Sequence, residues 1–328
     1  MDRRILMFAL ITALCAIVLS PATPLAQAQT YPNRPIKLIV PFATGGATDL
    51  YARTLGAALS VELAQQVVVE ARAGAGGLTG VDVLAKSPPD GYTLCLAGVA
   101  ALSAIPFMVT KMPFDWQKDL ALISLVVRVP EVAVVNQTIA ANTLPEFVAH
   151  ARTNPGKINF GSAGAGSVTH LGVELLKTEA KIDLVHVPYR GAGPAITDLL
   201  GNHIQLLISD APVIASYVHS GKLKALATTS ETRSILLPDV PTTGEAGYPR
   251  VNSDNWYGLV APASTPPDVL ARLQKATVAV LQSLELKKQF DNLGAVLIPS
   301  TPDEFLTYIK SEQAKWGPLV AATGVKLD

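Results

Sequence analysis

The chain has 328 residues, and its 26 Lys and Arg residues balance 26 Asp and Glu residues for a formal net charge of zero. A neutral chain lacks the basic surplus typical of proteins that bind nucleic acid or anionic membranes, so we expect neither partner. The histidines show no metal-ligand spacing such as His-x-x-x-His, and we expect no metal and no cofactor.

Residues 1–28 predict a secretory signal peptide. Arg3 and Arg4 precede an apolar run over residues 5–19, and Ala26-Gln27-Ala28 supplies the small residues that a signal peptidase requires. The apolar run is shorter than the roughly 20 residues of a membrane span. We therefore expect cleavage after about Ala28 and a periplasmic mature chain, whose only cysteine is Cys95, in an apolar strand.

The strand expected at residues 36–41 runs into a glycine turn. Gly45 and Gly46 end the apolar run, and Thr48 or Asp49 is placed to cap a helix over residues 48–63. The first N–H groups of a helix have no internal partner and point into such a turn with the positive end of the helix dipole. A phosphate or carboxylate could bind there without a lysine or arginine, although an ordinary α/β turn fits this stretch as well.

The same order of strand, glycine turn and helix returns at residues 158–178 and 184–200, and less clearly at 67–86. Neither of the two clear repeats completes the dinucleotide fingerprint, because Thr169 and Ile196 stand where its third glycine belongs. A nucleotide cofactor site is therefore only weakly supported.

The remaining segments alternate strands and helices, which predicts an α/β fold with mainly parallel sheets. Further strands are expected at residues 92–97, 203–210, 223–229 and 255–262, and further helices at 144–153, 268–281, 286–293 and 302–322. A long β-rich run over 122–135, broken at 128–131, predicts passage from one domain to another. The expected division is lobe 1 from residues 29–130 plus 254–328, lobe 2 from residues 131–253, and a ligand cleft between them.

Ordered motifs along the mature chain carry a family resemblance. They are Tyr31-Pro32-Asn33-Arg34-Pro35-Ile36, Pro41-Phe42-Ala43-Thr44-Gly45-Gly46 with Asp49, Gly74-Ala75-Gly76-Gly77, Pro89-Asp90-Gly91-Tyr92-Thr93-Leu94, Gly161-Ser162-Ala163-Gly164-Ala165-Gly166-Ser167 with His170, Val187-Pro188-Tyr189-Arg190-Gly191, and Trp256-Tyr257-Gly258-Leu259. On these motifs the chain resembles the extracytoplasmic substrate-binding receptors of tripartite tricarboxylate transporters, the Bug proteins.

This resemblance implies a fold, a ligand class and a partner. The fold is a type II-like, two-lobed periplasmic binding protein with two sheets joined by two crossover strands. The ligand is a small carboxylate, which the receptor delivers to the subunits of a membrane permease, and a monomer is expected. One departure is Thr44, where the family commonly has proline; its hydroxyl would either donate to a carboxylate or cap a turn.

The residues expected to bind the ligand lie on the three glycine turns and at one strand end. They are Phe42, Thr44, Gly45, Gly46, Asp49, Ser162, Ala163, Ala165, Gly166, Ser167, His170, Tyr189, Arg190, Gly191 and Asp210. The roles of three remain open. Arg190 either pairs with a second carboxylate or packs on Tyr189; His170 either hydrogen-bonds the turn or ligand or fixes the helix start; and Asp210 either orients its loop, accepts from the ligand or caps a helix.

An exported hydrolase is the main alternative class. Ser162 or Ser167 with His170 would supply a nucleophile and a base, and Asp198 or Asp210 could orient the base. The Gly-x-Ser-x-Gly motif of a strained nucleophile turn is absent. We therefore expect a binding protein and not an enzyme, with no catalytic residues.

Overall fold

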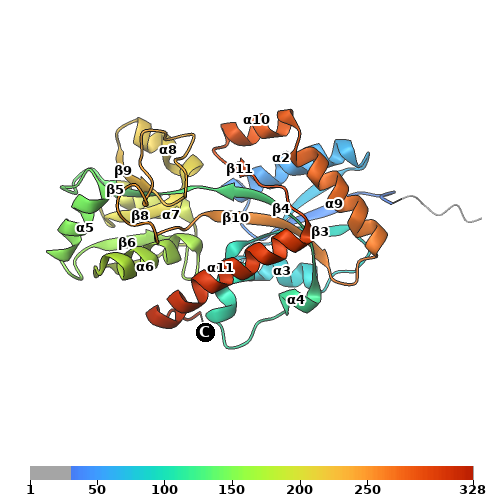
Figure 1. The fold of residues 1–328 in the computed structure, drawn as a ribbon, viewed down its shortest axis with the longest axis horizontal. Coiled ribbons are helices and arrows are strands. Elements are labelled where there is room, and N and C mark those ends of the chain that lie inside the picture. Colours follow the sequence, from blue (N-terminus) through green and yellow to red (C-terminus); the bar gives the residue numbers. More distant parts are fainter. Residues whose placement is uncertain (1–30, 328) are drawn as a thin grey trace, which may run out of the picture. The chain divides into compact units, whose positions relative to one another are not determined.

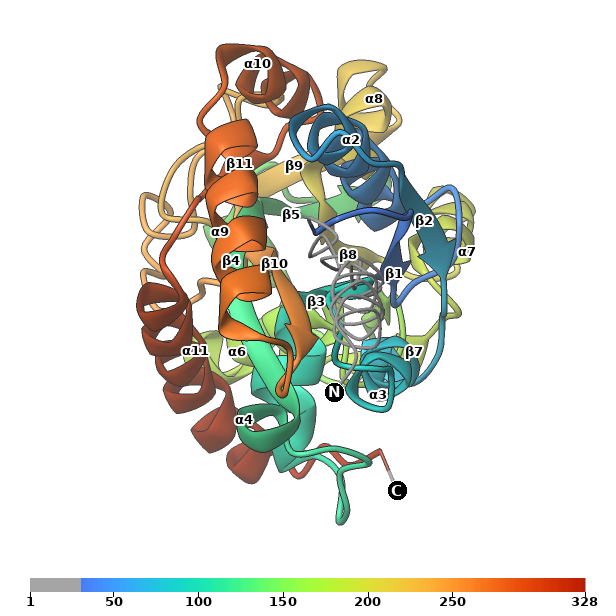
Figure 2. The ribbon, with the colours of Figure 1, turned by 90° about the vertical axis from the view of Figure 1, so that its right-hand side faces the viewer.

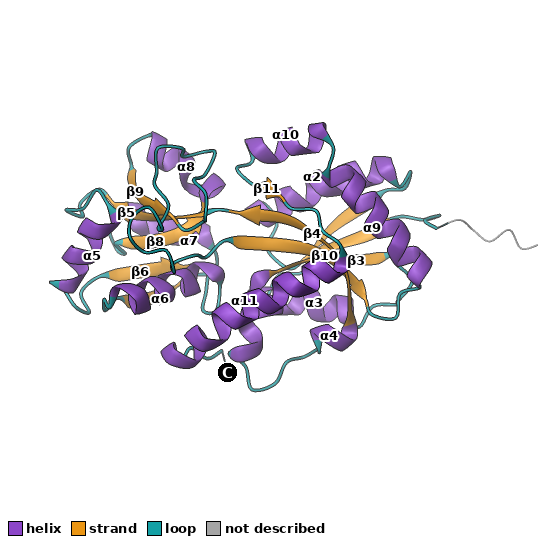
Figure 3. Ribbon diagram, in the orientation of Figure 1, coloured by secondary structure: helices purple, strands orange, loops and turns teal. Residues whose placement is uncertain are grey.

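The computed structural model describes residues 31–327, so the predicted signal peptide, residues 1–28, lies outside the described residues. Residues Arg34–Asp328 form one compact unit of mixed α/β structure with two sheets (Figures 1 and 3). No helix in the described range is both long and apolar enough to cross a membrane.

The first sheet has six strands in the order β11-β4-β10-β3-β1-β2. β1 is parallel to β2 and β3, whereas β10 is antiparallel to β3 and β4, and β11 is antiparallel to β4. The strands are β1 (Ile36–Val40), β2 (Val67–Ala71), β3 (Thr93–Gly98), β4 (Leu120–Val129), β10 (Asn255–Pro262) and β11 (Val296–Leu297).

The second sheet has five strands in the order β7-β6-β8-β5-β9. β6 is parallel to β7 and β8, and β5 is antiparallel to β8 and β9. The strands are β5 (Glu131–Asn136), β6 (Asn159–Ser162), β7 (Val185–Pro188), β8 (Leu206–Asp210) and β9 (Leu223–Thr228).

Two segments join the sheets, as predicted. β4 passes through Pro130 directly into β5, and the chain returns from β9 through residues 229–254 into β10, which pairs with β4 along its whole length (Figure 1). The sheet membership of the strands fits the predicted lobes, whose boundaries remain a prediction.

The helices follow the expected strand–helix order with small shifts at their ends. They are α2 (Ala47–Glu62), α3 (Leu78–Ala85), α4 (Trp116–Asp119), α5 (Leu144–Arg152), α6 (Val168–Ala180), α7 (Ala192–Leu200), α8 (Ala211–His219), α9 (Pro267–Leu281), α10 (Leu284–Asn292) and α11 (Pro302–Thr323). The sequence signals predicted neither α4 nor the π-helical turn Ala100–Ala104, and they indicated α8 only as the helix that Asp210 would cap.

The longest helix, α11, connects the cores of the two halves. A capping box of Thr301 and Glu304 starts it, and Trp316 and Leu319 share one apolar cluster with α3 and with Leu171 of α6. The ribbon of α11 runs beside that of α6 (Figure 2). Cys95 is fully buried in β3, as expected of a small hydrophobic side chain.

The strand pairings determine where the glycine turns lie. β6, β7 and β8 are parallel, so their carboxyl ends share one edge, and Asp210 at the end of β8 pairs with Glu131 at the start of β5. In the first sheet, Gly98 at the end of β3 pairs with Tyr257 near the start of β10. The carboxyl ends of the parallel strands in both sheets therefore lie at the crossover segments, where ligands of open α/β folds usually bind.

Candidate functional site

The first glycine turn joins β1 to α2. Gly46 occupies the N-cap position with an extended backbone, φ −82° and ψ 172°, and no side chain caps the helix. Within residues 31–327, the backbone N–H groups of Gly46, Ala47 and Thr48 donate to no protein acceptor. Because these N–H groups lie at the positive end of the helix dipole, the turn has three free hydrogen-bond donors for an anion.

The Asp49 side chain stabilises this turn. Its buried Oδ2 accepts hydrogen bonds from the Gly45 N–H at 3.1 Å and from Arg53 Nε at 2.9 Å. The hydrogen bond from Arg53 lowers the pKa of Asp49, which keeps the carboxylate ionised. Thr44 is exposed and, within the described chain, its hydroxyl has no hydrogen-bond partner, so it caps no turn.

A chain of hydrogen bonds runs from this turn to the second sheet. Thr48 Oγ1 donates to the Tyr257 hydroxyl at 2.8 Å, and Asn255 Nδ2 donates to the same oxygen at 2.9 Å. Asn255 Nδ2 also reaches Asp210 Oδ1 at 3.4 Å. The ring of Phe42 lies edge-on to Tyr257, with 6.0 Å between centroids. β10 thereby connects the N-terminus of α2 with the end of β8.

The sequence-based expectation gives residues 255–262 as a strand with Tyr257 in a family motif, but it leaves Asn255 and Tyr257 out of the ligand site. Alternate residues of a strand share one face, so two polar side chains at positions 255 and 257 lie side by side where the chain enters the sheet. Beside the motif, that spacing is the signal in the sequence that points to them.

Asp210 stands at the N-cap position of α8, but its side chain makes no capping hydrogen bond. Burial raises the pKa of Asp210 to about 6; the hydrogen bond from Asn255 opposes the shift and the nearby charge of Asp254 adds to it. Its β5 partner Glu131 is fully buried with one carboxylate oxygen unpaired, and burial raises the pKa of Glu131 well above its usual range. Since the Asp210 side chain accepts no hydrogen bond from the start of α8, helix capping, one alternative for this residue, is not observed.

The second glycine turn, between β6 and α6, uses most of its N–H groups internally. The Ala163 N–H donates to Thr169 Oγ1 at 2.9 Å, and the Gly164 N–H donates to Ser162 Oγ at 3.1 Å. Ser167 caps α6 by accepting from its third residue at 3.3 Å. In the described chain, only the N–H of Ala165 is left without an acceptor in the stretch 163–167.

His170 contacts this turn directly. Its Nδ1 accepts a hydrogen bond from the Gly166 N–H at 3.2 Å, which realises the expected bond from His170 to the turn. The ring stacks on His186 of β7 with centroids 3.8 Å apart, and Phe160 stacks on His186 at 4.9 Å. Burial lowers the pKa of His170 to about 3 and that of His186 to about 4, so both rings are neutral at pH 7.

The third glycine turn, between β7 and α7, is tied to the second. The Tyr189 N–H donates to the Ser162 carbonyl at 3.1 Å, and the Tyr189 hydroxyl donates to Asp198 Oδ2 at 2.6 Å. Gly191 has φ +120°, a conformation that favours glycine. Arg190 is exposed and, within the described residues, forms no ion pair, and its guanidinium lies over no aromatic ring, so stacking on Tyr189, one of its two alternatives, is not observed.

The serine–histidine pair of the hydrolase alternative is not formed as expected. The ring of His170 bonds the Gly166 N–H, whereas Ser162 Oγ lies 2.7 Å from Nε2 of His186. Ser162 has no exposed surface, and Ser167 Oγ donates to the Gly164 carbonyl at 2.6 Å. Neither hydroxyl is therefore presented to a substrate by a histidine base.

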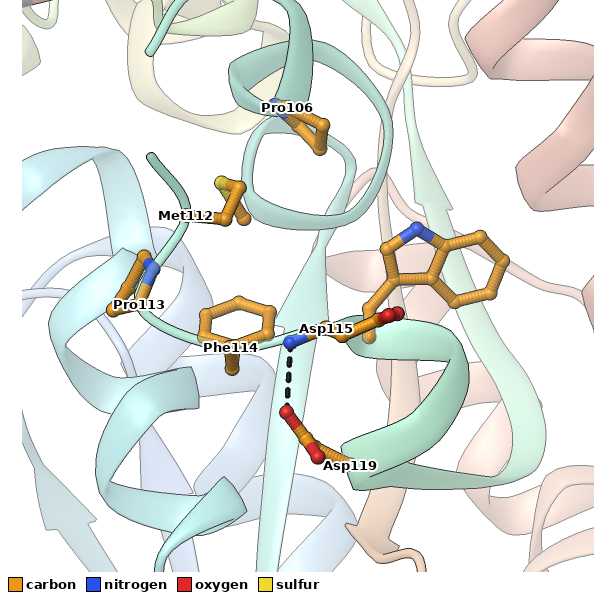
Figure 4. Close-up of a pocket in the computed structure, with 7 residues that line it drawn as sticks. Pro106, Met112, Pro113, Phe114, Asp115 and Asp119 are labelled. Carbon is orange, nitrogen blue, oxygen red and sulfur yellow. Dashed lines mark hydrogen bonds between the residues drawn. The ribbon is translucent and has the colours of Figure 1, made fainter. Parts of the chain in front are cut away.

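A separate hollow of about 460 Å³ lies away from the glycine turns, over residues 106–119 (Figure 4). It is lined by Pro106, Met112, Pro113, Phe114, Asp115, Trp116 and Asp119, and the Asp115 N–H donates to Asp119 Oδ2 at 2.7 Å. None of the predicted ligand residues lines it. Among the described residues, no group of three or more His, Cys, Asp and Glu side chains is arranged to hold a metal ion.

Comparisons with known proteins cover almost the whole chain. Residues 51–325 match the family described as tripartite tricarboxylate transporter family receptor. Protein BugT of Bordetella pertussis is 40% identical over 304 residues, which span 92% of this chain and 93% of BugT.

Two solved structures share the fold. The periplasmic binding protein BugD has a TM-score of 0.81 and 33% identity, covering 90% of this chain and 99% of BugD. Rpa4515 of R. palustris, solved with adipate, has a TM-score of 0.84 and 28% identity, covering 90% of this chain and 99% of that protein.

Proposed function

Because this chain belongs to the tripartite tricarboxylate transporter family of receptors, we propose that it binds a small carboxylate in the periplasm and delivers it to a membrane permease. The membership confirms the resemblance that the ordered motifs predicted, and the two-sheet fold is that of a periplasmic binding protein. No nucleic acid, metal or cofactor has a part in the proposal.

The first glycine turn carries the proposal. Gly46, Ala47 and Thr48 present three unused N–H groups at the start of α2, and no side chain competes for them. A carboxylate placed there would accept charge-assisted hydrogen bonds, each contributing roughly 1.5–3 kcal/mol net. Three such bonds account for much of the roughly 8 kcal/mol of micromolar binding, before ordering costs.

The other two turns and Asp210 complete the proposed site. They lie at the carboxyl ends of β6, β7 and β8, on the edge of the second sheet that meets the crossover segments. We place the ligand-binding site at the residues expected from sequence, with the cleft between lobe 1, residues 29–130 and 254–328, and lobe 2, residues 131–253. Asp49 and His170 act within this set by holding their turns.

The ligand class is a small carboxylic acid, and a diacid is one candidate within it. Rpa4515, which shares the fold, was solved with adipate, a diacid. Arg190 is an exposed cation in the third turn without an ion pair among the described residues, so it is free to meet a second carboxylate. Mono- and tricarboxylates, aromatic acids and amino acids stay within the class to be tested.

The proposal also includes export to the periplasm and assembly with a permease. We assign the mature chain to the periplasm on its predicted signal peptide. By its family, we assign it as a monomer that meets a large and a small permease subunit. The absence of a hydroxyl presented by a base argues against the hydrolase alternative.

A thermal-shift screen of residues 29–328 against mono-, di- and tricarboxylates tests the proposal, with nucleotides and sugars as controls. Ligand at 100 times its Kd stabilises the folded state by about 2.7 kcal/mol, so a true ligand raises Tm in a dose-dependent way. We expect shifts from one or a few carboxylates alone. Shifts from nucleotides alone would contradict the proposal, and so would turnover of an ester that is lost in Ser162→Ala.

A further inference from the structure

The second glycine turn depends on a histidine that does not face a ligand. The Gly166 N–H is buried and donates to His170 Nδ1 at 3.2 Å. Gly166 has φ +75°, a left-handed conformation that favours glycine. His170 itself is 4% exposed, so it acts on the turn and not on solvent.

A second histidine supports the other side of the turn. His186 stacks on His170 with an interplanar angle of 11°, and its Nε2 lies 2.7 Å from Ser162 Oγ. Ser162 Oγ in turn accepts from the Gly164 N–H and lies 3.1 Å from the Gly164 carbonyl. One imidazole therefore reaches each end of the turn, and the two rings contact each other.

Resting on the carboxylate-receptor function proposed above, we propose that His170 and His186 are positioning residues: two neutral, stacked imidazoles that hold the second glycine turn in its ligand-binding shape. His170 fixes the Gly166 end and His186 fixes the Ser162 end. Neither ring touches the ligand.

The geometry requires neutral rings. Nδ1 of His170 can accept the Gly166 N–H only while it carries no proton, so protonation there sets two donors against each other. Two charged rings would also repel each other across the 3.8 Å stack. The charged groups that face the pair are Lys177 and Glu174 of α6, which pair with each other at 2.8 Å, with Glu174 Oε1 3.8 Å from Nε2 of His170.

Two substitutions of His170 test its two contacts separately: the hydrogen bond that Nδ1 accepts and the stacking of its ring on His186. His170→Phe keeps a flat ring but removes the acceptor, whereas His170→Asn places an amide oxygen near the position of Nδ1 but removes the ring. His219→Asn, at an exposed histidine of α8, is the control for loss of an imidazole. Amide hydrogen exchange of Gly166 reports the turn without any ligand, and Kd for the best carboxylate of the screen reports binding.

We expect His170→Phe to raise the Gly166 exchange rate and the Kd about tenfold each, the size of one lost hydrogen bond. His170→Asn should restore most of the exchange protection, and His219→Asn should match the parent protein. Wild-type exchange and affinity in a folded His170→Phe would overturn the proposal. Equal changes of exchange rate and Kd in His170→Phe and His170→Asn would also overturn it, because the Nδ1 acceptor would then have no effect of its own.

The pH dependence of Gly166 exchange protection is a second readout. With the pKa of His186 near 4 and that of His170 near 3, Gly166 protection should hold from pH 8 to 5 and fall below about pH 4. A loss of protection between pH 7 and 6 would contradict the neutral pair. If no carboxylate binds but Gly166 responds as expected, the receptor function fails while the positioning role stands; if a carboxylate binds and Gly166 does not respond, the positioning role fails alone.

Discussion

The turns after β1 and β6 have the same order of strand, glycines and helix but use their N–H groups in opposite ways. At the first, Gly46 leaves the start of α2 uncapped and its donors free. At the second, Ser167 caps α6, and side chains of Thr169, Ser162 and His170 accept from three of the other donors. A glycine turn therefore becomes an anion site through the donors that its neighbours leave unused, and a rigid wall when most of them are bound.

The largest expected effect is on binding at the first turn. Gly46 has φ −82°, which any residue can adopt, and an added Cβ would meet only the Ala43 carbonyl oxygen at 3.6 Å. Gly46→Val should lower the free energy of unfolding by only about 1 kcal/mol, because valine is a poorer N-cap residue than glycine but fits the backbone conformation. By blocking approach to the free donors it should weaken carboxylate binding about 100-fold, the equivalent of two lost hydrogen bonds.

Isothermal titration of Gly46→Val beside Gly244→Val checks this. Gly244 is exposed, and an added Cβ would meet Thr242 Oγ1 at an ordinary 3.5 Å, so that variant should bind as the parent does. Unchanged affinity in Gly46→Val would remove the first turn from the site.

The second prediction concerns stability at the two turns. Gly45 and Gly166 have similar φ values, +82° and +75°, but a Cβ on Gly45 meets nothing within 4 Å, whereas one on Gly166 lies 2.9 Å from Leu327 and 3.0 Å from Met108. Gly45→Ala should cost about 1 kcal/mol of backbone strain. Gly166→Ala should cost about 2 kcal/mol or more, because contact is added to strain.

Urea denaturation of both variants gives these costs. Adding Leu327→Ala to Gly166→Ala should recover part of the loss, since Leu327 is one of the two side chains in contact. Equal costs at Gly45 and Gly166 would mean that the C-terminal residues do not press on the second turn.

A smaller effect is expected from the threonine behind each turn. Thr169 Oγ1 accepts from the Ala163 N–H and bonds Ser167 Oγ at 2.9 Å, whereas Thr48 Oγ1 makes one bond, to Tyr257. Thr169→Val should destabilise the fold by about 1.5 kcal/mol and Thr48→Val by about 1 kcal/mol. Chemical denaturation measures both, and a larger loss for Thr48→Val would reverse the contrast between an internally bonded turn and an open one.

The smallest effect is a pH dependence at Asp210, the far end of the chain of hydrogen bonds from the first turn. Burial raises the pKa of Asp210 to about 6 from an unfolded value of 3.8, so the charged carboxylate destabilises the folded state above pH 6 and this cost disappears below about pH 4. Asp210→Asn should therefore raise Tm at pH 7.5 and leave it unchanged at pH 4. Because part of its surface is exposed, the gain should stay below about 1 kcal/mol.

Thermal unfolding at the two pH values checks this prediction, with the His219→Asn variant as the control. A gain at pH 4 that equals the gain at pH 7.5 would show that charge is not the cause.

Local sequence patterns predicted the strands and helices well, because their signals lie within a few residues. The apolar run before Pro41 and the Pro267 start of α9 need no distant partner to be recognised. No bounds were predicted for α8, because its short apolar segment after Asp210 gives the same local signal as a buried strand.

The sequence by itself determined the order of elements, the two crossings at Pro130 and before Asn255, and the three glycine turns at the strand ends. The tertiary structure alone decided what those turns can do. The threonine that bonds the Tyr257 hydroxyl, the asparagine that bonds the Asp210 carboxylate and the His186 ring that stacks on His170 all come from distant elements, and no local pattern specifies them. A hydrogen-bond donor looks the same in sequence whether it is bound or free, and only the folded arrangement of its acceptors distinguishes the two.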